Sequence, residues 1–329
     1  MTENPKYMRT GIGSLPFKDV KEAIDVVLQY FPDVPFWPQL PKRSPLEDMF
    51  IPFLAGLPFF RLMGEGLAVE REGVGMEEFL EDLDGDRVER FAIPYELAPG
   101  LYEFLERAKA VEDSISYLKG QITGPFSCGL ALKAGKEPII YNPDIFFVVR
   151  KGIKMRARWM VERMKEACPS KPVILFFDEP YLCSLDLYFG PQAKEWIREM
   201  YEDLLEGLAA LKGMHICGNT DWTLIMDLPI DILNFDAFNF FDSLFSFEEA
   251  IVSFYRKGAM ISPGVVPSDA VINETDLKEL KALREGFTSR LIALGVVTDI
   301  VLLTPSCGLG ALDEKEAVRA LELLSQLST

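Results

Sequence analysis

The sequence predicts an α/β fold, a single (β/α)8 barrel of the TIM type spanning residues 1–329. Three observations favour it: short apolar segments alternate with amphipathic helical ones, eight such apolar segments are found, and several end in polar or thiol residues. A doubly wound open sheet is the alternative, but no G-x-G-x-x-G follows the first segment. The expected strands are 8–14, 33–40, 116–124, 172–180, 213–217, 231–236, 258–264 and 299–305.

The individual elements differ in how clearly the residues specify them. Segment 172–180, PVILFFDEP, is continuously apolar, as a strand buried on both faces should be. Segment 33–40 is weaker, because its prolines remove hydrogen-bond donors from a ladder. About 75 residues separate the second strand from the third; we expect an insertion there, at about 45–110, with a hairpin around FFRLMGEGLAVE. The expected helices include 18–31, 191–210, 276–294 and a last one that begins with a capping box at Asp313 and Glu316.

Composition excludes several classes of partner. A net charge of −17 and the lack of a Lys/Arg cluster disfavour nucleic acid, whose phosphates would be repelled. No uncharged apolar stretch reaches the roughly 18 residues of a membrane span, and the N-terminal residues lack a signal-peptide pattern. We therefore expect a cytoplasmic protein without a membrane partner. Five cysteines, an odd number without a tight repeat, suggest metal binding or catalysis rather than a disulfide framework.

The single histidine of the chain, His215, lies two residues before Cys217. On a strand that spacing directs both side chains to the same face. Cys307 follows the last expected strand, and in a closed barrel it can face the same space. Two cysteines and one histidine with an open fourth position describe a catalytic zinc site. Asp236, at the end of the neighbouring strand, could supply an oxygen ligand.

Structural interpretations of these residues remain open at this point. His215 could be a hydrogen-bonded histidine of the core. Asp178 and Glu179 could be paired acids for proton transfer, or Asp178 could cap a loop while Glu179 is held extended before proline. The other three cysteines are expected to be small buried hydrophobes: Cys128, Cys168 and Cys183.

Five motifs, in order along almost the whole chain, resemble those of one family: IGSLP (12–16), KGQITGP (119–125), FFDEPYL (176–182), HICGN (215–219) and TPSCGLG (304–310). The chain resembles the C-terminal catalytic barrel of cobalamin-independent methionine synthase. That family belongs to the superfamily of uroporphyrinogen decarboxylase and the coenzyme M methyltransferases, and HICGN is closer to the latter enzymes.

The resemblance implies roles for named residues. His215, Cys217 and Cys307 match the zinc ligands of the family. Asp236 stands where the family has a glutamate, one methylene longer. The homocysteine carboxylate and amine are held in the family by the I-G-S segment and the D-E-P aspartate, which match four residues here: Ile12, Gly13, Ser14 and Asp178.

Departures from the family pattern bear on the methyl donor. The family binds methyl-tetrahydrofolate partly through a tryptophan after T-G-P and a later glutamate, and uses a second histidine as proton donor. Here no tryptophan follows, Ser184 replaces the glutamate, and His215 is the sole histidine. Short single-barrel relatives use a methyl-corrinoid, so methylcobalamin or a corrinoid protein is the expected donor.

The expected function is thus a zinc-dependent methyltransferase that acts on a small thiol, first homocysteine, to give methionine. Three alternatives stay open: a methyltransferase for a thiol like coenzyme M, a decarboxylase like uroporphyrinogen decarboxylase, and a non-catalytic zinc- or corrinoid-binding protein. A decarboxylase would not need thiols at strand ends, and it would want basic groups for several substrate carboxylates.

Overall fold

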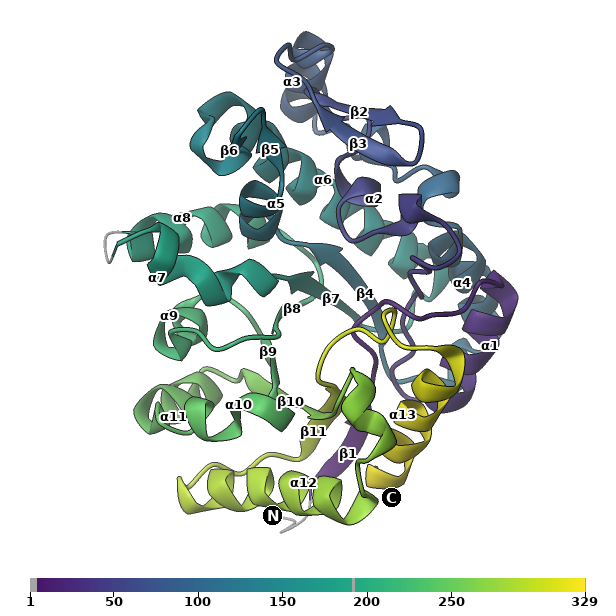
Figure 1. Ribbon diagram of the computed structural model, residues 1–329, viewed down its shortest axis with the longest axis vertical. Helices are drawn as coiled ribbons and strands as arrows, with labels where there is room; N and C mark the ends of the chain where they lie inside the picture. The colour runs from purple at the N-terminus through teal and green to yellow at the C-terminus, as the bar shows by residue number, and fades with distance from the viewer. Residues whose placement is uncertain (1–4, 191–192, 329) are drawn as a thin grey trace.

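The computed structural model describes residues 5–190 and 193–328, and its centre is a curled, all-parallel sheet (Figure 1). The strand order is β1-β11-β10-β9-β8-β7-β4, which is the order of a barrel in which each strand pairs with its sequence neighbour and the last with the first. The predicted α/β barrel fold is confirmed. The sheet strands are β1 (Lys6–Arg9), β4 (Leu118–Thr123), β7 (Val173–Asp178), β8 (Leu211–Ile216), β9 (Ile232–Asp236), β10 (Met260–Val266) and β11 (Ile300–Pro305).

The second expected strand, 33–40, differs from the prediction. It forms only isolated bridges, because Pro35 and Pro38 have no N–H to donate. The segment nevertheless lies between β1 and β4. Gln39 donates its N–H to the carbonyl of Gly13 (3.1 Å), and Lys119 donates its N–H to the carbonyl of Pro35 (2.9 Å). This irregular segment therefore closes the barrel in place of a strand.

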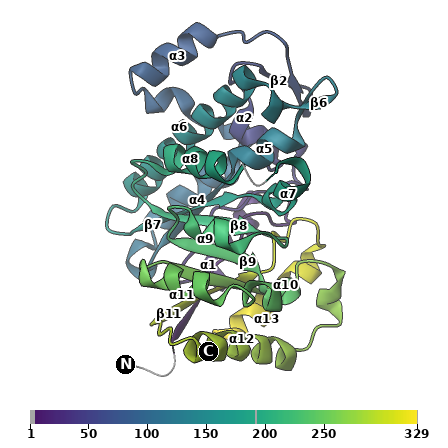
Figure 2. The same ribbon diagram turned by 90° about the vertical axis from the view of Figure 1, so that its left-hand side faces the viewer.

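The helices pack around the outside of the sheet (Figures 1 and 2). Expected helices 18–31 and 276–294 are confirmed, and so is the capping box of Asp313 and Glu316; the expected helix 191–210 is observed from residue 193, since 191–192 lie outside the described residues. No helix in the described ranges is long and apolar enough to cross a membrane. The helices are α1 (Val20–Tyr30), α2 (Ile51–Leu54), α3 (Met76–Asp84), α4 (Pro99–Lys109), α5 (Pro125–Ala131), α6 (Pro143–Ala167), α7 (Leu185–Tyr188), α8 (Ala193–Leu205), α9 (Trp222–Asp227), α10 (Ala237–Leu244), α11 (Glu248–Arg256), α12 (Leu277–Ala293) and α13 (Glu314–Leu327).

The segment expected to be an insertion contains the predicted hairpin, β2 (Phe60–Met63) and β3 (Gly66–Val69). The hairpin and α3 lie at the end of the molecule farthest from both chain ends (Figures 1 and 2). Helix α4, at the end of the segment, packs against α1 and α6. The buried Arg156 of α6 donates to the carbonyls of Pro52 (2.8 Å) and Ala55 (2.6 Å), which attaches α2 to α6.

Candidate metal centre and substrate cavity

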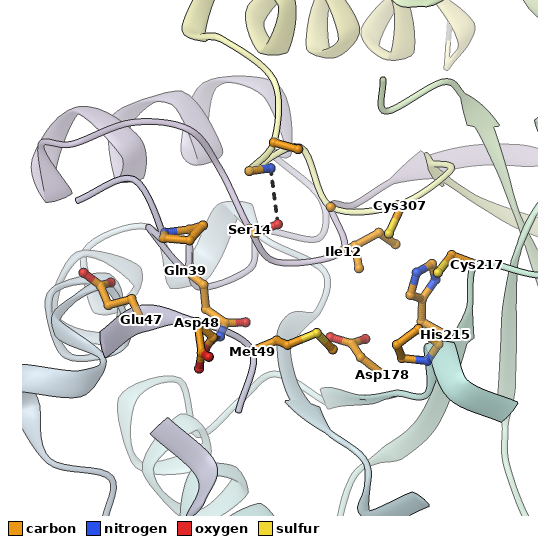
Figure 3. A pocket seen from close by; sticks show the side chains of 15 residues that line it. Ile12, Ser14, Gln39, Glu47, Asp48, Met49, Asp178, His215, Cys217 and Cys307 are labelled. Carbon is orange, nitrogen blue, oxygen red and sulfur yellow. Dashed lines mark hydrogen bonds between the residues drawn. The ribbon is translucent and has the colours of Figure 1, made fainter. Parts of the chain in front are cut away.

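A cavity of about 470 Å³ lies at the carboxyl ends of the sheet strands (Figure 3). Its walls come from the segments that follow β1, β7, β8 and β11 and from the segment between residues 39 and 49. Chemistry in barrels of this type is found at this face. The lining residues are Ile12, Ser14, Gln39, Pro41, Glu47, Asp48, Met49, Asp178, Pro180, His215, Cys217, Cys307, Gly308, Gly310 and Ala311.

His215, Cys217 and Cys307 come together at one side of this cavity. His215 is in β8, Cys217 is the first residue after that strand, and Cys307 is the second residue after β11. The imidazole nitrogen and the two sulfurs all lie within 4.8 Å of one another. Nε2 of His215 is buried and has no hydrogen-bond partner among the described residues. Two thiols and one imidazole with an unpartnered ring nitrogen are a donor set that fits Zn²⁺.

Electrostatics within this cluster favour one thiolate. A hydrogen bond from the Cys307 thiol, together with His215, lowers the pKa of Cys217 to about 4. The same hydrogen bond raises the pKa of Cys307 well above its usual range. Burial lowers the pKa of His215, but Cys217, Asp178 and Asn234 outweigh burial and raise it overall. Without a metal, the Cys307 thiol and His215 thus both favour the thiolate form of Cys217.

Asp236, the fourth expected ligand, is not part of this group of three. It is the N-cap of α10: one carboxylate oxygen accepts from the backbone N–H of Asn239 (3.0 Å) and the other from its side-chain amide (2.7 Å). N-capping satisfies a helix N–H that would otherwise lack a partner. A ligand role for Asp236 would require the carboxylate to give up these contacts.

Asp178 lies at the end of β7, between the cluster and Met49 (Figure 3). Its Oδ1 is buried and without a hydrogen-bond partner among the described residues. Burial raises the pKa of this carboxyl to about 6, although His215 and Lys119 oppose the shift. An unpartnered carboxylate in a cavity is a site for a hydrogen-bonding or cationic group of a ligand.

Lys119 lies beneath the cavity and is fully buried. Its ammonium donates to the carbonyl of Ile12 and contacts the ring of Phe176, 4.7 Å from the centroid. Burial lowers the pKa of Lys119 to about 7, and Asp178 opposes that shift. Lys119 therefore holds the IGS segment in place and adds positive charge below Asp178.

The IGS segment packs against the loop that carries Cys307. Ile12 and Ser14 line the cavity, whereas Gly13 does not; a Cβ at Gly13 would lie 2.7 Å from the side chain of Gln121. The carbonyl of Ser14 accepts from the N–H of Leu309 (2.9 Å). A Cβ at Gly308 would lie 2.2 Å from Oγ of Ser14. Two of the sequence motifs, from the beginning and the end of the chain, thus contact each other at the mouth of the barrel.

Glu179 does not share the cavity with Asp178, so the two are not a catalytic pair of acids in this structure. Its buried carboxylate accepts from the backbone N–H groups of Phe126 (3.1 Å) and Ser127 (2.7 Å), and from the hydroxyl of Tyr201. Burial raises its pKa to about 7. Glu179 thus binds the first turn of α5, next to Gly124, and links the D-E-P and T-G-P motifs.

Of the remaining cysteines, Cys128 and Cys168 are buried as expected. Cys183 is exposed, and the expectation for it was wrong. It lies in the short helical turn Pro180–Ser184, where its thiol donates to the carbonyl of Pro180 (2.8 Å). The apolar strand β7 ends at Asp178, so Cys183 is not part of its buried run.

The sequence analysis missed several residues of this region. Asn234, in the middle of β9, forms a hydrogen bond with His215. The sequence feature that could have indicated its importance is a polar residue inside an apolar strand. Lys119 belongs to the KGQITGP motif, but no role was predicted for it. The segment that was predicted to be an insertion also lines the cavity, through Glu47, Asp48 and Met49. No pattern in the sequence indicated that these residues would reach the site.

Comparisons with known proteins support the fold alone. No protein-family model and no curated protein sequence matches the chain. A solved B12-independent methionine synthase from Shewanella sp. W3-18-1, in complex with selenomethionine, superimposes with a TM-score of 0.54 at 15% identity, covering 97% of this chain and 96% of that one. A psychrophilic family 10 endo-β-1,4-xylanase matches at 11% identity over 98% and 96% of the two chains with a TM-score of 0.33, a superposition too poor to relate the sites.

We expect Gly124→Ala to destabilise the protein, because its Cβ would lie 1.9 Å from Oε1 of Glu179. The backbone of Gly124 (φ −74°, ψ 160°) suits alanine, so the cost comes from crowding alone. The expected loss in the free energy of unfolding is about 1–3 kcal/mol. Denaturant titration measures it. Gly66→Ala is the matched control: its Cβ meets only the carbonyl of Met63 at 3.8 Å. Equal losses would contradict the importance of this contact.

Proposed function

We propose that this protein is a thiol S-methyltransferase that transfers a methyl group from a methyl-corrinoid to a small thiol at a zinc centre held by His215, Cys217 and Cys307. Homocysteine is the first candidate acceptor, and methionine the product. The observation that carries the proposal is the convergence of these three side chains, within 4.8 Å, in a cavity that also contains Asp178. Zinc bound there would lower the pKa of a thiol, so that a thiolate exists at neutral pH.

The ligand set fits a nucleophilic thiolate. Two cysteinates and a neutral histidine offset the charge of a divalent ion, so a substrate thiolate keeps substantial negative charge. In the proposed transfer, a lone pair of the substrate sulfur would form the new S–C bond, and a methyl-corrinoid donor would keep the electron pair of the broken Co–C bond. No proton is needed by that leaving group, which agrees with a chain whose only histidine is in the metal cluster.

The charges of the cavity favour an acceptor that carries a cation. Three of the fifteen lining residues are carboxylates, Glu47, Asp48 and Asp178, and none is lysine or arginine. Glu47 is paired with Arg43 (2.6 Å) and Asp48 accepts from two backbone N–H groups, whereas Oδ1 of Asp178 has no partner among the described residues. A buried carboxylate gains a charge-assisted hydrogen bond from an ammonium group. Such a cavity favours an aminothiol such as homocysteine over a sulfonate such as coenzyme M. It also disfavours the polycarboxylate substrate of a decarboxylase.

A second candidate, a methyltransferase for a thiol like coenzyme M, is supported by the HICGN motif and opposed by these charges. A non-catalytic zinc or corrinoid carrier would bind zinc stoichiometrically without turning over any thiol. Cytoplasmic location and a corrinoid donor, whether free or bound to a partner protein, belong to the proposal as well.

We expect about one zinc per chain in the purified protein. Cys217→Ser and Cys307→Ser should each lose most of it, because each removes a thiolate ligand. Elemental analysis by mass spectrometry gives the stoichiometry. Cys183→Ser is the control, since Cys183 is exposed and outside the cluster. Full zinc retention in both ligand variants would remove the metal centre from the proposal.

Methylcobalamin, and not methyl-tetrahydrofolate, should support turnover. The chain lacks the tryptophan, glutamate and second histidine that the family uses for folate, with Ser184 in the glutamate's place. Loss of the methyl-cobalt absorbance with a panel of thiols measures the reaction with the corrinoid. Turnover with the folate donor at a similar rate would contradict the choice of donor.

Asp178→Asn should weaken the use of homocysteine strongly and the use of mercaptoethanol hardly at all. The variant keeps the size of the side chain and removes its charge. A charge-assisted hydrogen bond is typically worth about 1.5–3 kcal/mol, a factor of roughly 10–150 in affinity. The measurement is kcat/KM for both thiols in both proteins.

The control for this prediction is the thiol without an amine. If Asp178 only supports the fold, the variant loses thermal stability and both thiols suffer alike. Equal loss of kcat/KM would rule out amine binding by Asp178, and it would move thiols like coenzyme M to first place.

A further inference from the structure

Asn234 is a fully buried polar residue in the middle of the apolar strand β9. It is the register partner of His215 on β8 and of Ser262 on β10. Register partners in parallel strands direct their side chains to the same face, so the three lie at one level of the barrel interior. A buried amide costs free energy unless its donors and acceptor are all satisfied.

The contacts of Asn234 fix which way its amide points. Its Nδ2 lies 2.9 Å from the carbonyl of Ser262, 3.0 Å from Oγ of Ser262 and 2.9 Å from Oγ1 of Thr304. A backbone carbonyl can only accept, so the NH2 end must face Ser262. Oγ of Ser262 donates to the carbonyl of Leu302 (2.6 Å), which leaves its lone pairs free to accept from Asn234.

The amide oxygen is therefore the atom that faces the imidazole. Oδ1 of Asn234 lies 2.5 Å from Nδ1 of His215. An amide oxygen has no proton to give, so Nδ1 must carry the hydrogen. In the neutral ring Nε2 then holds the lone pair. Nε2 is also the nitrogen that is buried without a partner among the described residues, and the ring lies beside the sulfur of Cys217 (Figure 3).

From this geometry we infer that Asn234 is a positioning residue of the metal centre: it holds neutral His215 as the Nδ1–H tautomer and presents Nε2 to the metal. Ser262 and Thr304 act through Asn234 by fixing its amide. The neutral amide oxygen orients the ring without adding a negative charge, so the two thiolates alone set the charge of the ligand set. The metal part of this inference rests on the proposed function; the tautomer part concerns the metal-free protein.

Nuclear magnetic resonance tests the tautomer directly, because His215 is the only histidine of the chain. Metal-free protein with ¹⁵N-labelled histidine is measured at an alkaline pH at which the ring is neutral. Long-range ¹H–¹⁵N correlations should show a protonated Nδ1 and an unprotonated Nε2. The opposite tautomer in the wild-type protein would overturn the inference.

Two variants of similar size separate positioning from structural support. Asn234→Asp and Asn234→Leu both lose the donors to Ser262 and Thr304, so both should lower the melting temperature. Only Asn234→Asp keeps an acceptor for Nδ1. We expect it to keep the Nδ1–H tautomer and zinc affinity near that of the wild type. Asn234→Leu should lose the tautomer preference and about 10–100-fold in zinc affinity.

Zinc affinity is measured by competition with a chromophoric chelator, with Zn²⁺ as the only added ligand. Equal loss of affinity in both variants would show a purely structural role and overturn the inference. If Asn234→Leu does not fold, the wild-type tautomer and Asn234→Asp still decide. A wild-type protein that binds no zinc would refute the proposed function, while the tautomer measurement would stand by itself.

Discussion

The register of the parallel strands is the constraint on which the candidate site depends. Asp178, His215, Asn234 and Ser262 are successive register partners across β7, β8, β9 and β10. Their side chains therefore share one level and one face of the sheet. Cys217, two residues beyond His215, lies one level higher, at the mouth. A slip of one residue in β8 would turn both candidate metal ligands, His215 and Cys217, outward, because side chains alternate along a strand.

A second constraint concerns Cys307, the candidate metal ligand near the C-terminal end of the chain. Cys307 belongs to the last strand connection, and its loop is held against the IGS segment by the hydrogen bond from Leu309 to Ser14. Gly308 has no Cβ to obstruct this approach. On the other side of the barrel Glu179 binds the first turn of α5. The sequence motifs thus contain residues that hold neighbouring strand-to-helix loops together, as well as residues that line the cavity.

The parts of this site that follow a strand period could be predicted from the sequence. Apolar runs ending in Asp178, in the H-x-C pair and in Cys307 indicated one face, and the structure brings these residues together. Segment 33–40 was predicted as a strand, but its prolines remove hydrogen-bond donors from the ladder, so it closes the barrel through isolated bridges instead. The role of Asp236 could not be predicted either. An aspartate at this position is equally suited to capping α10 and to binding a metal, so the residue type does not distinguish the two roles.

The charge of the cavity bears on the kind of ligand that could lie beside His215, Cys217 and Cys307. Burial favours the neutral form of Asp178, whose pKa lies at about 6, and Lys119 and His215 oppose this. An ammonium group in the cavity would favour the ionised form in the same way, so binding of an aminothiol and ionisation of Asp178 reinforce each other. Lys119 donates to the carbonyl of Ile12 and does not line the cavity, so it is not the cation that contacts Asp178 there. A cationic group on a ligand would thus supply the partner that Oδ1 of Asp178 lacks among the described residues.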